Sequence, residues 1–155
     1  MAQQTDVKTV TRVARTQWRG TLRAEVQVRD CPSFFTDEPK GRGGLYEHPT
    51  PAEYTVAALT GCSAAHVELF AKEAGLPLAD CQVEGKLTLG HFPADDERSR
   101  NGGVTGIELD IRVTSSGTEA QFERVKALFR EQCVLYRFAK AAAPVKDNWK
   151  LIRPS

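Results

Sequence analysis

Four cysteines are the residues of this chain whose chemistry could go beyond packing, and two of them lie in segments with helical patterns. Cys62 falls near the middle of a small, apolar stretch, and Cys133 falls at the end of a second patterned stretch. Two thiols on crossing helices can meet, which would place a reactive thiol beside a resolving thiol, as in cysteine redox enzymes. Cys31 follows a strand and Cys81 precedes one, in no such pattern. Because free cysteine is among the most buried residue types, a structural role is the alternative for all four.

Histidine is the second residue type that could take part in chemistry. His66 follows Cys62 by one helical turn, so the two share a helix face, and an imidazole there could lower the pKa of the thiol or act as a base. The alternative is a simple surface neighbour. His48 and His91 lie in predicted loops without patterned partners. The sequence contains no CxxC pair, HExxH motif or Ser-His-Asp arrangement, so its spacing predicts no zinc site and no hydrolase.

A long helix over residues 50–75 must position the first of these thiols. Thr50 and Glu53 have the spacing of a capping box, and Gly75 provides the end of the helix. The stretch VAALTGCSAA at 56–65 is small or apolar all round, which predicts a helix buried on most sides. In an unbroken helix Glu53 faces away from the thiol, so we expect it to act mainly as a cap.

A shorter helix must position the second thiol. Thr118 and Gln121 form another capping box, and apolar residues then recur at helical spacing up to Cys133. We therefore expect Cys133 on the apolar face of this helix near its end, with a further short helix at 134–142.

Alternating apolar and polar residues predict the strands around these helices. They fall within 7–29, where two strands are expected, and at 33–36, 83–89, 107–113 and 145–152. The charged segment 93–103 is predicted to be a hairpin loop, and the glycine cluster at 41–44 lacks the spacing of a nucleotide-binding loop. The order of strands, long helix, strands, helices and strand indicates an α+β fold with antiparallel sheet.

Composition places the chain among ordinary globular proteins. Its 155 residues are 41% hydrophobic and 26% charged, which favours a single domain over residues 1–155. A net charge of +1 gives no indication of nucleic-acid binding. No stretch has the length of a membrane span, and the start of the sequence is polar, so we expect no membrane association and a cytoplasmic location with reduced thiols.

A resemblance to the OsmC/Ohr family is carried by the segment TDEPKGRGGLYEHPTPAEYTVAALTGCSAAHVELFAKEAGLPL. As in that family, an acidic-Pro-Gly loop leads into a Pro-x-Glu helix start and then a small-residue run ending in cysteine. The later segment FERVKALFREQCVLYR resembles the family's second cysteine helix, and the details are nearest the OsmC-like branch. The resemblance implies an α+β, OsmC-like fold. It also implies antiparallel sheets wrapped around central long helices in an intertwined homodimer.

The same resemblance implies a thiol-dependent peroxidase that acts on organic hydroperoxides without a cofactor or a metal. By position, Cys62 would be the peroxidatic thiolate and Cys133 the resolving thiol, with an external dithiol as reductant. Arg42 lies in the loop that carries the family's site arginine, although other arginines are rivals for this role: Arg19, Arg23 and Arg29. The family's glutamate position is occupied by Ala52, and the proline that usually follows the second cysteine is Val134.

Two further functions remain open at this point. An OsmC-like dimer could bind a small apolar or sulfur-containing ligand, with Cys62 lining the pocket. A redox sensor could use a disulfide to change a surface that a partner recognises. Turnover of an organic hydroperoxide by the protein with a dithiol would separate the peroxidase from both.

Overall fold

The computed structural model describes residues 8–90 and 102–154. It contains two compact units, Met1–Pro51 and Ala52–Ser155, and each is described here by itself. The assignment of the whole chain to a single domain stays a prediction. Residue His91 and most of the predicted hairpin loop at 93–103 lie outside the described residues.

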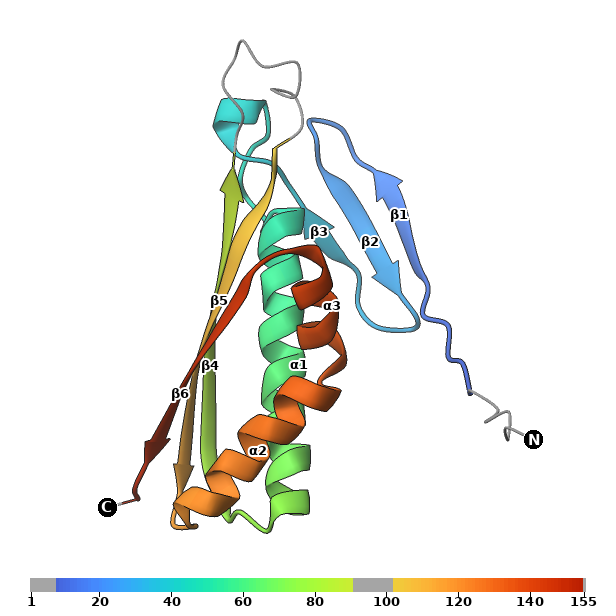
Figure 1. Cartoon of the computed structure of the whole chain (residues 1–155). Helices are drawn as coiled ribbons and strands as arrows, with labels where there is room; N and C mark the ends of the chain where they lie inside the picture. The colour runs from blue at the N-terminus through green and yellow to red at the C-terminus, as the bar shows by residue number, and fades with distance from the viewer. Residues whose placement is uncertain (1–7, 91–101, 155) are drawn as a thin grey trace, which may run out of the picture. The chain divides into compact units, whose positions relative to one another are not determined.

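The first unit is a small antiparallel sheet followed by a loop (Figure 1). Its strands are β1 (Ala14–Trp18), β2 (Ala24–Val28) and β3 (Phe34–Thr36), in the order β1-β2-β3. The predicted pair of strands and the short third strand are therefore confirmed. The expected alternation of burial is not found, because every β2 residue is partly buried and every β1 residue, including Trp18, is exposed in the described structure.

A buried carboxylate, Asp37, organises the loop that follows β3. Its oxygens accept hydrogen bonds from the backbone N–H groups of Glu38, Leu45 and Glu47. The Arg23 side chain bridges Asp37 and Glu47. Burial alone would raise the pKa of Asp37, but these donors outweigh it and hold that pKa well below its usual value. The charge of Asp37 thus fixes the loop that contains the glycine cluster at 41–44.

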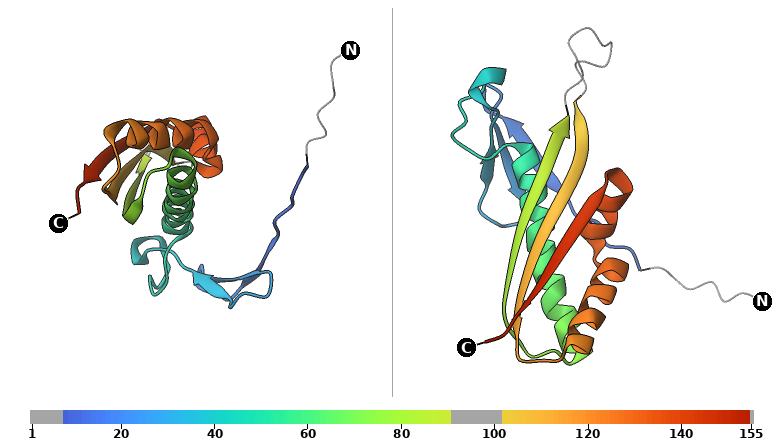
Figure 2. Two further views of the ribbon diagram at one scale, coloured as in Figure 1. Left: turned by 90° about the horizontal axis from the view of Figure 1, so that it is seen from below. Right: turned by 60° about the vertical axis from the view of Figure 1, so that its left-hand side comes forward.

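The second unit packs helices against one face of a three-stranded sheet (Figures 1 and 2). Its elements in chain order are α1 (Pro51–Ala74), β4 (Leu78–Gly90), β5 (Gly103–Ser115), α2 (Glu119–Gln132), α3 (Val134–Ala142) and β6 (Val145–Ile152). These confirm every helix and strand that the sequence predicted in this part, with β4 and β5 longer than expected. The core lies between the helices and the apolar face of the sheet.

The last strand differs from the prediction in its direction. β4 and β5 pair antiparallel, as expected, but β6 lies parallel to β5. The reason is the connection: α2 and α3 carry the chain back along the sheet before β6 begins, which is how parallel neighbours are joined. The expectation of purely antiparallel pairing therefore holds for the first sheet and fails for the β5–β6 edge of the second.

The helix ends follow local rules that were visible in the sequence. Gly75 has a φ of 67°, a left-handed conformation that glycine adopts without strain, and it ends α1. The Thr118 hydroxyl and the Gln121 side chain form the predicted capping box at the start of α2. Gln121 also donates a 2.7 Å hydrogen bond to the Gly75 carbonyl, which ties the start of α2 to the end of α1. The capping box of Thr50 and Glu53 stays a prediction.

Aromatic packing joins β6 to α2. The Trp149 ring meets Phe122 and Phe129 edge to face, with ring centroids 6.0 and 5.1 Å away. Such arrangements stabilise a core beyond the burial of apolar area alone. On the other side of the unit, Gly85 of β4 lets α1 approach closely, since a Cβ there would lie 2.6 Å from the Thr60 methyl group.

Helix α1 is buried along one side only, so the prediction of burial on most sides is wrong for the single chain. The sheet and the α2–α3 segment cover the face that carries Leu59, Ser63, Val67 and Phe70. Five other small or apolar residues of the helix are exposed: Ala57, Ala58, Gly61, Ala65 and Leu69. We call these five residues the small-residue face of α1. A single layer of sheet cannot enclose a helix that is apolar all round, and within the second unit neither the sheet nor α2 and α3 cover this face.

None of the helices in the described part of the chain combines the length and hydropathy that crossing a membrane would require.

Candidate functional site

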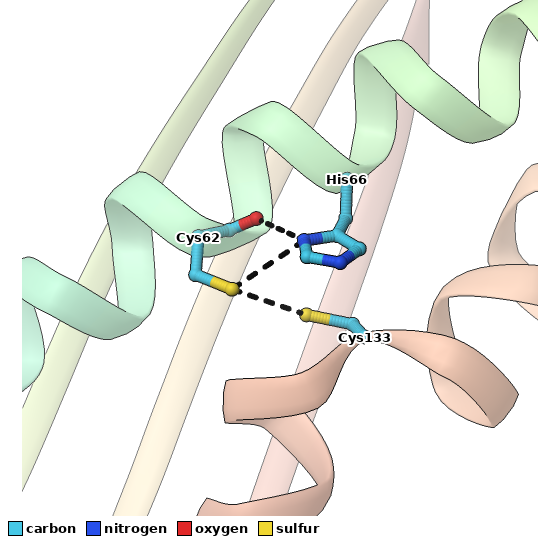
Figure 3. A group of neighbouring side chains, drawn as sticks. All are labelled: Cys62, His66 and Cys133. Atoms are coloured by element: carbon cyan, nitrogen blue, oxygen red, sulfur yellow. Dashed lines mark hydrogen bonds between the residues drawn. The ribbon is translucent and has the colours of Figure 1, made fainter. Parts of the chain in front are cut away.

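The structure brings Cys62 and Cys133 together. Their Sγ atoms lie 3.9 Å apart, and His66 completes a cluster of three side chains (Figure 3). Both cysteines are free thiols. The helices do meet at these two positions, as the sequence analysis allowed, so a disulfide could form after a small movement of either side chain.

The position of Cys62 on α1 explains its partial exposure. Cys62 lies between the buried line of Leu59 and Ser63 and the small-residue face, at the edge of the covered side of the helix. Its side chain is therefore half-buried and within reach of a small molecule. An inert core thiol would be enclosed on all sides, so this placement favours reactivity over a purely structural role.

Cys133 lies at the end of α2, as predicted, and α3 begins at the next residue. It is the residue that joins the two helices: its N–H donates to the Phe129 carbonyl at the end of α2, and its carbonyl accepts from Arg137 in α3. Its backbone is extended, with φ −65° and ψ 114°. The predicted further helix at 134–142 is confirmed with the same bounds.

The surroundings of Cys133 favour the protonated thiol. Burial raises the pKa of Cys133 to about 11, and the nearby Cys62 sulfur acts in the same direction. The backbone N–H groups of Leu135 and Tyr136, at the start of α3, oppose this effect without cancelling it. Cys133 is also fully enclosed in the described structure. Cys133 therefore remains a protonated thiol beside the more accessible Cys62.

His66 faces both the backbone and the sulfur of Cys62. Its Nδ1 atom lies 2.8 Å from the Cys62 carbonyl oxygen and 3.4 Å from Sγ. Since a carbonyl oxygen only accepts, Nδ1 carries a proton in this arrangement and donates it. The sulfur lies near enough to share this N–H with the carbonyl oxygen, and a shared N–H can stabilise a thiolate. The structure confirms the shared helix face of His66 and Cys62 and places the imidazole beside the thiol.

A second network holds the start of β6 against the helices, and the sequence analysis missed it. Asp147 accepts hydrogen bonds from the Tyr136 hydroxyl at 2.8 Å, from Trp149 Nε1 at 2.6 Å and from Arg130 at 2.8 Å. Burial alone would raise the pKa of Asp147, but these three donors lower it. The available signal was the strand pattern, because Asp147 shares the inward register of Trp149, and a carboxylate there needs partners. Through Tyr136 this network fixes α3 just after Cys133.

The remaining cysteines are separate from the cluster. Cys31 is exposed in the turn after β2. Cys81 lies within β4 rather than in a turn before the strand, because β4 begins at Leu78. Burial, with the charge of Asp80, raises the pKa of Cys81 to about 11. Among the residues that the structure describes, neither Cys31 nor Cys81 has the imidazole and thiol partners that Cys62 has.

The candidate arginines all belong to the first unit. Arg42 lies in a single turn of 3₁₀ helix, Lys40–Arg42, and its exposed side chain reaches Glu38 at 3.5 Å. Its role at the thiols stays a prediction. Among its rivals Arg23 is held by ion pairs with two carboxylates, and Arg19 pairs with Glu25.

Comparison with known proteins identifies the family. A family model described as "OsmC-like protein" matches residues 41–147, which is more than half of the chain. The chain belongs to the OsmC-like protein family. The resemblance drawn from the cysteine segments is thereby confirmed. No curated protein matches this OsmC-like chain.

Solved structures of OsmC and Ohr proteins share the fold. An OsmC-like protein from Mycoplasma pneumoniae is 14% identical, with a TM-score of 0.78 over 94% of this chain and 99% of that protein. An organic hydroperoxide resistance protein, OsmC, from Legionella pneumophila is 17% identical, with a TM-score of 0.72 over 93% and 99%. The organic hydroperoxide resistance protein OhrB of Bacillus subtilis is 19% identical, with a TM-score of 0.62 over 91% and 98%. At these identities the likeness establishes the α+β, OsmC-like fold.

Proposed function

We propose that this OsmC-like protein is a thiol-dependent peroxidase that reduces organic hydroperoxides. The observation that carries the proposal is the 3.9 Å approach of Cys62 to Cys133, with His66 against the first sulfur. Family membership supports it, as do the names of two structural relatives, which are called organic hydroperoxide resistance proteins.

The two thiols take different roles because their surroundings differ. The thiolate is the nucleophile in cysteine chemistry, and Cys62 is partly exposed with a donor beside it. Cys133 is enclosed and its pKa is raised to about 11, so it is the poorer first nucleophile. Cys62 therefore attacks the peroxide, and Cys133 acts afterwards.

The reaction then proceeds in three balanced steps. The Cys62 thiolate attacks the terminal oxygen of ROOH, the O–O bond breaks, and the alkoxide takes a proton and leaves as ROH. The Cys133 thiol attacks the sulfur of the resulting sulfenic acid, which forms the disulfide and releases water. An external dithiol reduces this disulfide by exchange and restores both thiols.

An apolar pocket supports a preference for organic peroxides. It has a volume of about 450 Å³ and is lined almost entirely by apolar side chains from α1, α3 and the sheet. Its lining includes Leu59, one helical turn before Cys62, and Leu135, two residues after Cys133. An alkyl group gains free energy by leaving water for such a surface, whereas H2O2 has no apolar part to bury.

A protein that only binds a small apolar ligand could use the same pocket. Measuring hydroperoxide turnover distinguishes the peroxidase from such a binding protein. Consumption of cumene hydroperoxide with dithiothreitol should be rapid for the wild type and abolished in Cys62→Ser, which removes the nucleophile. Cys133→Ser should leave a sulfenic acid at Cys62 that dimedone traps and mass spectrometry detects. Cys31→Ser and Cys81→Ser are the matched controls and should keep full activity. Loss of activity in either control, with Cys62→Ser active, would refute the assignment.

A further inference from the structure

The three side chains at the site have the chemistry and spacing of a metal centre. One ligand atom from each of Cys62, His66 and Cys133 can be chosen so that all lie within 4.8 Å of one another. Two thiolates and an imidazole form a soft donor set, which suits zinc among the common divalent metal ions. The spacing of the cysteines along the sequence predicted no such site, because the ligands come from separate helices that only the fold brings together.

The distances fit coordination better than they fit a bond between the sulfurs. Zinc, with bonds of about 2.3 Å to sulfur and about 2.0 Å to nitrogen, holds two sulfurs about 3.8 Å apart and sulfur and nitrogen about 3.5 Å apart. The observed separations are 3.9 Å between the sulfurs and 3.4 Å from Cys62 Sγ to His66 Nδ1, and a ring nitrogen of His66 lies within 4.8 Å of the Cys133 sulfur. A disulfide needs the sulfurs at about 2.05 Å, so the reduced side chains stand at the coordination distance.

We propose that the reduced protein binds a zinc ion through the Sγ atoms of Cys62 and Cys133 and a ring nitrogen of His66. Binding releases the protons of the two thiols, because zinc coordinates thiolates. If Nδ1 is the ligand, the neutral imidazole carries its proton on Nε2 instead. The Cys62 carbonyl then loses the His66 side chain but keeps the backbone N–H that an α-helix supplies. The three protein ligands leave a fourth tetrahedral position for water or another small ligand.

Zinc binding and the Cys62–Cys133 disulfide exclude each other at this site, because both use the same two sulfurs. The release of zinc by hydroperoxide rests on the proposed peroxidase activity, whereas the zinc binding itself does not. One organic hydroperoxide and two protons convert the zinc-bound thiolate pair into a disulfide, an alcohol, water and free Zn²⁺. The thiolates lose the two electrons that the O–O bond gains. Oxidation therefore releases the ion, and the disulfide leaves no thiolate pair at this site for zinc to bind.

The binding is tested on the reduced, metal-free full chain with Zn²⁺ alone, in competition with a chromophoric chelator. We expect a single ion per chain, and Co²⁺ in its place should show thiolate charge-transfer absorption and the strong visible bands of tetrahedral cobalt. The double variant Cys31→Ser/Cys81→Ser is the matched control and should bind zinc like the wild type. Oxidised wild-type protein, which has the same fold and no free thiol pair, should not bind.

Two variants distinguish coordination from other effects. Cys62→Ser removes a ligand from a partly exposed position, and His66→Asn keeps an N–H donor near the sulfur while removing the coordinating nitrogen. Each should weaken zinc binding by at least about tenfold, since even the loss of an outer-shell partner has that effect. Failure of the reduced wild type to bind, or unchanged affinity in Cys62→Ser, would overturn the proposal. Hydroperoxide turnover is measured separately on the metal-free protein, so the test of the proposed peroxidase activity does not depend on the result for zinc binding.

Discussion

His66 is the residue whose contribution to the thiol chemistry can be isolated most directly. Its Nδ1 atom lies 3.4 Å from the Cys62 sulfur and can share its N–H between that sulfur and the Cys62 carbonyl, and a hydrogen bond to a charged group contributes ~1.5–3 kcal/mol. His66→Ala should therefore slow the oxidation of Cys62 by at least about tenfold at neutral pH, as followed by mass spectrometry after mixing with one equivalent of peroxide. His66→Asn, which retains an N–H donor, should recover part of the rate.

His48 provides the control for this experiment. It stacks on Phe35 in the first unit, with ring centroids 5.0 Å apart, so His48→Ala removes an imidazole without touching the thiol cluster. Equal losses of rate in His48→Ala and His66→Ala would show that the effect is not a hydrogen bond to the sulfur.

The pKa of Cys133 makes the resolving step dependent on pH. Burial raises this pKa to about 11, so Cys133 is a thiol at neutral pH. As the pH rises toward that pKa, the thiolate fraction of Cys133 increases about tenfold for each pH unit. The conversion of the Cys62 sulfenic acid to the disulfide should therefore accelerate steeply from neutral pH upward. Dimedone trapping at increasing pH measures this step, and the trapped fraction should fall. A trapped fraction that stays constant with pH would contradict the enclosed position of Cys133.

At the scale of elements, the sequence predicted what depends on local rules and missed what depends on tertiary contact. The capping residues, the Gly75 stop and the strand alternation are local signals, and they located α1, α2, α3 and the strands. The parallel direction of β6 and the hydrogen bonds that Asp147 accepts from α2 and α3 arise from contacts between different elements. The candidate site shows the same division, because Cys62 and His66 share a helix, whereas their approach to Cys133 required the fold.

The capping box of α2 allows a test of element stability. Thr118→Ala removes the hydroxyl that accepts the Gln121 N–H at 3.2 Å, and the usual effect is a loss of about 1 kcal/mol of unfolding free energy. The melting temperature should fall by about 2–4 °C for a chain of this size. Thr118→Ser keeps the hydroxyl and should melt close to the wild type. If the alanine and serine variants melt together, the hydroxyl does not stabilise the helix start.

For the whole molecule, the small-residue face of α1 supports the prediction of a homodimer. Ala58, Gly61 and Ala65 recur at helical spacing, and Leu69 at the end of this line is 56% exposed. Small side chains let two helices approach closely, and covering this line would remove apolar area from water. We expect sedimentation at micromolar concentration to give the mass of two chains.

Gly61 is the position at which this expectation can be tested. Beyond the backbone of its own helix, no atom of the described residues lies within 4 Å of a Cβ built there, so the single chain leaves room for Gly61→Leu, which also raises helix propensity. In a dimer packed through this face the leucine should force the helices apart and shift the protein toward monomers, with unchanged circular dichroism. Gly61→Ala, with a side chain no larger than its neighbours, should remain dimeric. A monomeric wild type would exclude the interface.

The two tryptophans have a consequence for spectroscopy, because the chain carries one in each compact unit. Trp18 is 71% exposed on β1, so its fluorescence emits as it would in water and is open to iodide quenching. Trp149 lies among Phe122 and Phe129 with its indole N–H held by Asp147, so its emission is blue-shifted and protected. In Trp18→Phe the tryptophan fluorescence comes only from the second unit, and in Trp149→Phe it comes only from the first. Denaturation curves of these two variants, recorded side by side, would show whether the units melt together as one cooperative domain or one before the other.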